Sequence, residues 1–347
     1  LNMDRAAGPR SASLGNFQFG AVATETIEDA LLHLARQNEQ AVREAVGSHG
    51  HFRFRETRFV EFIFLLSEQW CLEKSVSYQA VEILERFMVK QAEAICAQAV
   101  AQLGDSEWTE AQNWRARKEQ LCSKFILRLV SCVQLASKLS FHYKIINNLT
   151  ALHFLQALGY QYTKEELLES ELDVLKSLDF QINRSTPLEY VETLLEVLGY
   201  NGCVVPATRL HATCLSLLDL VYLLHGPVYE SLLRSAVGSA TPSQLQGEQF
   251  SPVQEDFMLL AVGVIAASAF VQSHACWSQV VRHLQSITGI ASESIAEFSY
   301  AVLTHGVGVS PTAVPPLQAA WAPALLSPPA AQRVGHRLQR PPASLAE

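Results

Sequence analysis

Residues 125–139 read Phe-Ile-Leu-Arg-Leu-Val-Ser-Cys-Val-Gln-Leu-Ala-Ser-Lys-Leu, and this stretch decides the fold. Apart from Arg128, Gln134 and Lys138, its residues are apolar or small. Fifteen residues suit a helix better than a strand, and a helix without a polar face must be enclosed by other helices. The stretch therefore predicts a central buried helix with a lysine at its rim.

The composition indicates an all-α protein with two domains. The chain has 347 residues, of which 49% are hydrophobic and 17% charged, so most of it should pack into sizeable cores. Helix-forming residues dominate, and no series of alternating strands is evident. The formal net charge of −8 argues against direct nucleic-acid binding, because no basic face is available to neutralise phosphates.

The cysteines and the apolar segments indicate a cytosolic or nuclear protein. The 7 cysteines include no CxxC pair, and most lie in apolar helical patterns, which is typical of reduced core thiols. The first residues lack the apolar core of a secretory signal. The longest apolar run, 257–271, is too short to span a bilayer and fits a buried helix, so we expect no membrane association.

Turn signals and composition divide the chain into five segments. We expect disorder in 1–20, an N-terminal helix in 21–50, a first helical unit in 51–183, a second in 184–308, and a Pro/Ala-rich disordered tail in 309–347. Within the first unit, 89–123 has the pattern of an insertion with helical pieces, and within the second, 237–253 has that of a loop. Two capping boxes, Thr163 to Glu166 and Thr186 to Glu189, predict helix starts.

The second unit repeats the first in outline. Its helices are expected near 187–198, 207–225, 228–236, 254–272, 277–287 and 292–304. The segment Leu135-Ala-Ser-Lys138 aligns with Ala266-Ala-Ser-Ala269, and Val174-Leu175 aligns with Val302-Leu303. We therefore predict two tandem five-helix units, each built around a central apolar helix.

The repeat is broken at two charged positions. Lys138 corresponds to Ala269 and Glu171 to Ser299, so this cation and anion occur only in the first unit. One interpretation is a surface ion pair between packed helices, which contributes little. The other is an interface hot spot, with the charges set among apolar neighbours, namely Leu139, Leu175, Phe180 and Ile182.

Several motifs in the first unit resemble the cyclin box, and their order is more specific than any one of them. Leu135-Ala-Ser-Lys138, Tyr162-Thr-Lys164 and Glu171–Phe180 resemble helices three to five of that box, and Ile83–Met88 resembles helix two. In cyclins the matching lysine and glutamate hold the regulatory helix of a partner kinase, and the apolar neighbours line the same groove. The resemblance implies a partner-binding site made of Lys138, Leu139, Glu171, Leu175, Phe180 and Ile182.

The first helix of the box departs from cell-cycle cyclins. Arg55-Glu-Thr-Arg-Phe59 stands where those cyclins have Met-Arg-Ala-Ile-Leu, part of a docking patch for short substrate motifs. In this alignment Glu56 replaces the arginine that pairs with an acid on helix two, although Glu85 still supplies the acid. Substrate docking through this patch is therefore not expected.

The chain as a whole most resembles a divergent branch of the cyclin family that is associated with meiotic crossover formation. The segments that suggest it are 67–80, 164–171 and 190–200. This resemblance implies a nuclear, chromosome-associated protein of meiotic cells, with the cytoplasm as the second expected location. It also implies a cyclin-dependent kinase as the expected partner and meiotic recombination proteins as further partners.

No constellation in the sequence predicts catalysis, a cofactor or a metal site. His211 and Cys214 are three apart on an expected helix, and no further ligand pair accompanies them, so we interpret them as a polar-face histidine beside a core thiol. His274 and Cys276 are interpreted in the same way. HExxH, P-loop and GxGxxG motifs are absent from the sequence.

Four Ser/Thr-Pro pairs lie in the expected loop and tail: Thr241-Pro242, Ser251-Pro252, Ser310-Pro311 and Ser327-Pro328. All four should be accessible to proline-directed kinases, but ordinary Ser/Pro-rich disorder explains them equally, and we favour that explanation.

Two functions follow from the resemblance. In the first, the chain is a non-catalytic subunit whose Lys138 and Glu171 grip a cyclin-dependent kinase. In the second, it is a scaffold of cyclin fold that recruits recombination or ubiquitin-pathway proteins without activating a kinase. The retained Lys138–Glu171 pair favours the kinase-binding subunit, and the altered first helix of the box keeps the scaffold as an open alternative.

Overall fold

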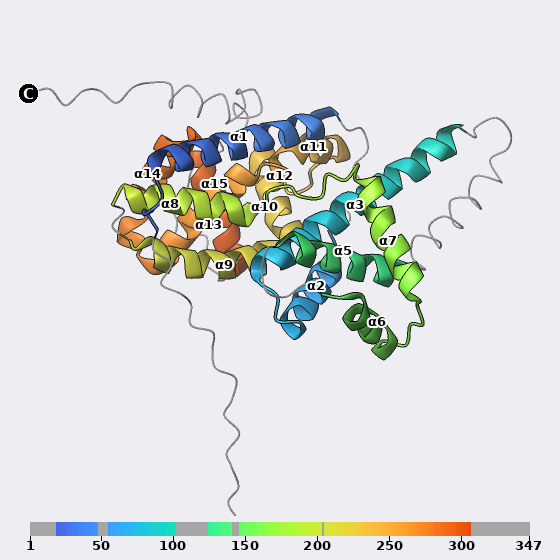
Figure 1. The fold of residues 1–347 in the computed structure, drawn as a ribbon. Helices are drawn as coiled ribbons and strands as arrows, with labels where there is room; N and C mark the ends of the chain where they lie inside the picture. The colour runs from blue at the N-terminus through green and yellow to red at the C-terminus, as the bar shows by residue number, and fades with distance from the viewer. Residues whose placement is uncertain (1–18, 48–54, 102–123, 141–145, 203–204, 307–347) are drawn as a thin grey trace, which may run out of the picture.

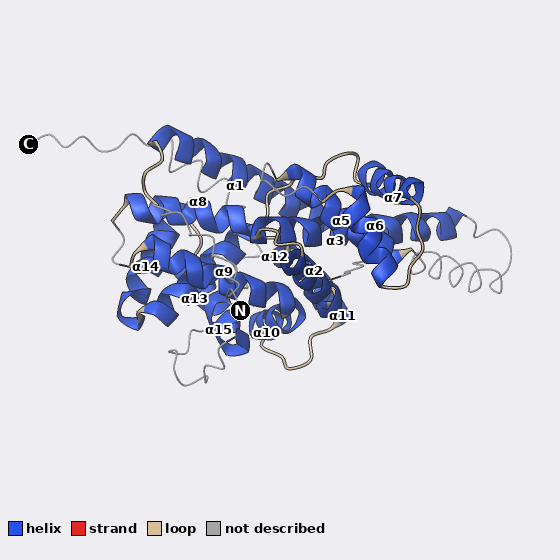
Figure 2. Cartoon of the chain, turned by 60° about the horizontal axis from the view of Figure 1, so that its bottom comes forward, coloured by secondary structure: helices blue, strands red, loops and turns tan. Residues whose placement is uncertain are grey.

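A computed structural model describes residues 19–47, 55–101, 124–140, 146–202 and 205–306 (Figure 1). These residues form helices joined by turns and loops, and Figure 2 shows no strand among them. The predicted all-α class is therefore confirmed. The predictions for 1–18, for most of the expected insertion and for the tail lie outside the described residues.

The helices group around two apolar helices, α5 and α13. The N-terminal half contains α1 (Thr24–Gly47), α2 (Thr57–Gln69), α3 (Lys74–Ala101), α5 (Phe125–Leu139), α6 (Asn148–Ala157) and α7 (Lys164–Ser177). The C-terminal half contains α8 (Pro187–Tyr200), α9 (Ala207–Leu223), α10 (His225–Val237), α11 (Gln244–Gln249), α12 (Ser251–Gln254), α13 (Phe257–Gln272), α14 (His274–Thr288) and α15 (Ser292–Gly306).

The central helix α5 has the bounds that the sequence predicts. Every residue from Leu129 to Ser137 is buried, and the helix packs against α2, α3, α6 and α7. The Ser131 hydroxyl donates a hydrogen bond to Leu127 O at 2.9 Å, and the Ser137 hydroxyl donates one to Gln134 O at 2.7 Å. Because these two hydroxyl groups donate within the helix, that part of α5 can be surrounded by apolar side chains.

The second apolar helix, α13, is buried from Met258 to Ala269 and packs against α8, α9, α14 and α15. Asp256 caps its start by accepting a hydrogen bond from Leu259 N–H at 2.9 Å. The long N-terminal helix α1 is tied to the same point, since Asn38 Nδ2 donates to Asp256 Oδ1 at 2.8 Å and Asn38 Oδ1 accepts from Met258 N–H at 3.1 Å. Figure 1 shows α1 lying along the C-terminal group of helices.

Both predicted capping boxes are present. Thr163 N–H donates to Glu166 Oε2 at 2.9 Å, and Glu166 N–H donates to Thr163 Oγ1 at 3.2 Å. Thr186 N–H donates to Glu189 Oε1 at 3.4 Å, with Pro187 as the first helical residue of α8. These reciprocal bonds fix where α7 and α8 begin.

α3 continues without a break to Ala101, so residues 89–101 of the expected insertion are helical, as its predicted helical pieces allow. The prediction for the following loop was wrong. The expected loop 237–253 contains α11 and most of α12, because Ser243 and Gln246 form a third capping box, with Ser243 N–H donating to Gln246 Oε1 at 2.8 Å. Ser251 is only 2% exposed, so the prediction that its Ser-Pro pair is accessible was also wrong.

In the described part of the chain, no single helix is both long and apolar enough to cross a membrane. α9 and α10 satisfy length and composition only when taken together, and they are bent by 85° relative to each other.

The packing of α13 against α15 depends on Gly263. A Cβ atom added there would lie 2.7 Å from Cγ of Phe298, whose side chain is fully buried and cannot move aside. Gly263→Ala should therefore lower the free energy of unfolding by about 1–3 kcal/mol, as overpacking does. Urea denaturation followed by circular dichroism measures this.

The matched control is Gly247→Ala in α11, where an added Cβ meets nothing within 4 Å. It should cause no loss of stability, because alanine also favours the helical backbone. Equal stability of the two variants would contradict the packing argument.

Candidate functional site

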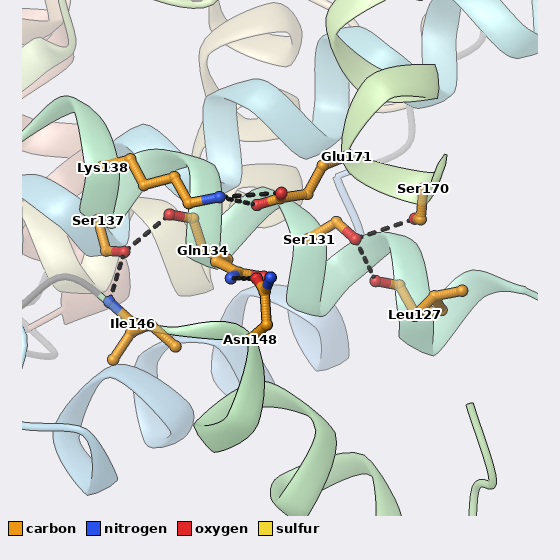
Figure 3. A network of polar contacts seen from close by, with 9 residues as sticks. All are labelled: Leu127, Ser131, Gln134, Ser137, Lys138, Ile146, Asn148, Ser170 and Glu171. Atoms are coloured by element: carbon orange, nitrogen blue, oxygen red, sulfur yellow. Dashed lines mark hydrogen bonds and ion pairs between the residues drawn. The ribbon is translucent and has the colours of Figure 1, made fainter. Parts of the chain in front are cut away.

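The predicted ion pair forms at the rim of α5. Lys138 Nζ lies 2.6 Å from Glu171 Oε1 and 2.9 Å from Oε2, so the lysine bridges both carboxylate oxygens (Figure 3). The Glu171 side chain is 7% exposed, whereas that of Lys138 is 38% exposed. The pair is thus anchored by its acid in the helix interface and reaches solvent through its base.

The local sequence explains why these two side chains meet. Lys138 occupies the last turn of α5, and the capping box at Thr163 fixes the register of α7 so that Glu171 faces it. Small residues let the two helices approach closely, and Ser131 Oγ lies 2.9 Å from Ser170 Oγ, within hydrogen-bond distance across the interface. Two further hydrogen bonds hold the start of α6 against α5, Gln134 Nε2 to Asn148 Oδ1 at 2.6 Å and Ile146 N–H to Ser137 Oγ at 3.1 Å (Figure 3).

Three of the four predicted apolar neighbours offer surface. Leu139 and Leu175 are half-buried, and Phe180 is 61% exposed. The Phe180 backbone has φ of +60°, a left-handed conformation that a bulky residue rarely adopts. Its N–H donates to Leu175 O at 2.8 Å, so this turn presents the ring just past the end of α7.

Ile182 differs from the prediction. Its side chain is 8% exposed and belongs to the hydrophobic core, and its carbonyl accepts a hydrogen bond from Gln79 Nε2 at 2.7 Å. Ile182 therefore fixes the segment that follows Phe180 and offers little surface of its own.

Sequence reasoning missed two leucines on α7. Leu168 is 43% exposed and Leu172 is 41% exposed. Leu168 lies three positions before Glu171, and Leu175 lies four positions after it. Leu172 lies four positions after Leu168 and three before Leu175. The three leucines therefore form a stripe along the side of α7 that carries Glu171. Their i, i+4 and i, i+3 spacing was the available signal. We call this stripe together with Lys138, Leu139, Glu171 and Phe180 the α5–α7 surface.

The first helix of the unit also differs from the alignment. Arg55, and not a residue at position 56, meets the acids of α3: its Nε lies 2.5 Å from Glu85 Oε2 and its Nη2 lies 2.7 Å from Glu82 Oε1. Tyr222 of α9 donates to the same Glu82 oxygen at 2.8 Å. The arginine is thus present one position earlier than expected, and its network joins the two halves of the molecule.

Burial controls the protonation of this network. Burial tends to lower the pKa of Arg55, but the carboxylates of Glu82 and Glu85 raise it well above its ordinary value. Burial raises the pKa of Glu82, because it disfavours the charged carboxylate, and the positive charge of Arg55 opposes that rise. Each charge therefore depends on its partner.

The histidines and cysteines that the structure describes in the second half do not form a ligand set. His211 Nε2 lies 3.0 Å from Glu192 Oε1, whereas Cys214 is fully buried, and burial raises the pKa of its thiol to about 12. Of the cysteines that the structure describes, Cys132 and Cys214 are buried, Cys276 is intermediate and Cys71 is exposed. Within the described ranges, no three His, Cys, Asp or Glu side chains converge as metal ligands would.

Comparison with known proteins identifies the class. Cyclin N-terminal domain-containing protein 1 of Mus musculus is 75% identical over 310 residues, which cover 89% of this chain and 92% of the relative. The Homo sapiens protein of the same name is 77% identical over 308 residues, with the same coverage of 89% and 92%. No family model matches the chain.

These similarities and the helical fold define a cyclin-like protein. More narrowly, the chain belongs to the cyclin N-terminal domain-containing protein 1 family.

Proposed function

We propose that this protein is a non-catalytic regulatory subunit that binds a cyclin-dependent kinase through the α5–α7 surface. The observation that carries the proposal is the Lys138–Glu171 pair, whose acid is buried and whose base is 38% exposed. A lysine held at such a rim has Nζ protons available for a partner's carbonyl oxygens, while the carboxylate can accept from backbone N–H groups.

The apolar margin supports the same function. Phe180, Leu168 and Leu172 are each more than two-fifths exposed, although large apolar side chains on a free surface are usually scattered. Apolar anchors around a central charged pair are typical of protein–protein hot spots. A helix of the partner that packs along α5 and α7 would cover both the charged pair and its apolar neighbours.

Such binding would act on the kinase by positioning. A protein kinase needs the ion pair between its strand lysine and the glutamate of its regulatory helix, and that pair forms only when the helix is correctly placed. Docking that helix on the α5–α7 surface would hold it in place. The chain itself would contribute no catalytic group.

We further propose that the protein acts in the formation or maturation of meiotic crossovers, in the nucleus and on chromosomes of meiotic cells. The support is the resemblance to a meiotic branch of cyclins. Meiotic recombination proteins would be its further partners. The net charge of −8 supports recruitment by proteins and not by direct contact with nucleic acid.

The direct test is recovery of partners from meiotic tissue. The tagged full-length chain is used as bait, and bound proteins are identified by mass spectrometry. A cyclin-dependent kinase among the enriched proteins supports the proposal, and its absence from repeated recoveries that do contain other partners contradicts it.

Phe180→Ala should reduce recovery of that kinase about tenfold, because loss of a buried aromatic anchor removes about 1.4 kcal/mol or more of binding free energy. Tyr200→Ala is the matched control, since Tyr200 is 59% exposed at the end of α8, outside the α5–α7 surface. Quantitative immunoblotting of the recovered kinase measures the difference. An equal loss in both variants would show that the Phe180 ring is not part of the binding site.

The alternative function is a scaffold that recruits recombination or ubiquitin-pathway proteins without activating a kinase. The observation that favours it is the first helix, where Glu56, Thr57 and Arg58 are exposed polar residues in place of an apolar docking patch. Under this alternative, recovered partners would include no kinase whose activity rises when the chain is added.

A further inference from the structure

Three Ser/Thr-Pro pairs lie within the described residues. Thr186-Pro187 opens α8 with its threonine 1% exposed, and the other two have closely matched local sequences. Thr241-Pro242-Ser-Gln244 and Ser251-Pro252-Val-Gln254 both have proline next to the hydroxyl residue and glutamine three positions after it. A kinase that recognises only the local sequence would phosphorylate both. In the folded chain, however, the two residues differ in exposure.

Thr241 lies in the loop between α10 and α11 and is exposed. Its N–H donates to Ser239 Oγ at 3.3 Å, and the Ser239 hydroxyl donates back to Thr241 O at 3.4 Å. No hydrogen bond from another described residue engages the Thr241 hydroxyl. Because the residue before proline disfavours the helical backbone, the loop can present Thr241 in the extended form that a kinase cleft accepts.

Ser251 is the opposite case. It is 2% exposed and is the first residue of α12, where its carbonyl accepts from Glu255 N–H at 3.3 Å. α12 in turn packs against α1. A kinase would reach Ser251 only after this segment had opened locally.

We propose that Thr241 is a phosphorylation site for proline-directed serine/threonine kinases, and that folding protects Ser251. The Thr241 hydroxyl oxygen attacks the γ-phosphorus of ATP, the bond to ADP breaks, and the hydroxyl proton passes to the kinase's catalytic aspartate. The product carries about −1.5 to −2 additional charge on an exposed loop. This inference is independent of the α5–α7 surface.

The test uses the folded full-length chain and a purified proline-directed kinase that needs no cyclin, with ATP and Mg²⁺. Site occupancy is followed over time by mass spectrometry. Synthetic peptides spanning 236–247 and 246–257 are phosphorylated in parallel, so that any preference of the kinase for one local sequence is measured separately.

In the folded chain, Thr241 should be modified at least about tenfold faster than Ser251 after correction for the peptide rates, because modification of Ser251 waits for local opening. Thr241→Val should remove that phosphate without changing the circular dichroism melt. An unmodified Thr241 in a chain whose peptide is a good substrate would overturn the proposal. Equal rates at both residues in the folded chain would overturn the protection by folding.

Discussion

Lys138→Glu is expected to reduce recovery of a bound cyclin-dependent kinase about 30-fold or more, because disrupting a desolvated charge pair at an interface removes 2–5 kcal/mol. The substitution removes the donor that would bind the partner's carbonyl oxygens. It also sets a second carboxylate against Glu171, whose side chain is only 7% exposed. Co-purification of wild-type and variant chains with the same kinase, followed by quantitative immunoblotting, measures the change.

The double variant Lys138→Glu/Glu171→Lys separates binding from folding. It restores an ion pair between α5 and α7, so its melting temperature should return toward that of the wild type. Kinase recovery should stay low, because donor and acceptor have exchanged places. If Lys138→Glu alone recovers as much kinase as the wild type does, the α5–α7 surface is not the binding site.

Arg55→Met is expected to lower the free energy of unfolding by about 3–5 kcal/mol, the usual effect of leaving a buried charge without its partner. The Arg55 side chain is 7% exposed and touches both Glu82 and Glu85, and methionine keeps its length without its charge. Urea denaturation at several pH values measures the loss. Arg58→Met, on the exposed face of α2, is the matched control and should change stability by less than about 0.5 kcal/mol.

The pH dependence of Arg55→Met follows from Glu82. Burial raises the pKa of this carboxyl, and Arg55 is the group that opposes the rise. Without Arg55 the pKa of Glu82 in the folded state rises further above its value in the unfolded chain, so the folded state binds a proton that the unfolded state releases. The variant should therefore lose stability as pH increases from the ordinary range of a glutamic acid toward neutrality. A deficit relative to the wild type that does not change with pH would show that loss of Arg55 leaves the folded-state pKa of Glu82 unchanged.

Much of the fold was predictable because its signals are local. The bounds of α5 follow from one apolar run, and the starts of α7 and α8 follow from the capping boxes at Thr163 and Thr186. The contact between Lys138 and Glu171 was also predicted, since the two charges are present in one half of the predicted repeat and missing from the other.

The remaining features depend on contacts between distant residues. Ile182 was predicted at the rim of the site, but its side chain packs into the hydrophobic core, and its carbonyl accepts from Gln79, 103 positions earlier. Arg55 was misplaced by one position, because helix two shows where the acid is but not which neighbouring residue reaches it. α11 lacks an apolar stripe, and its capping box was the one local signal that was overlooked.

The tie between α1 and α13 has a consequence for synthesis of the chain on the ribosome. Asn38 and Asp256 are 218 positions apart, so at ordinary translation speeds α1 waits roughly 10–40 seconds for the segment that it binds. Ile27, Leu31 and Leu34 are buried in the finished protein, and during that interval they have no α8 to pack against until residue 200 is made and no α13 at all. The nascent chain is therefore expected to need chaperone cover at its amino-terminal end until nearly three-quarters of it has emerged.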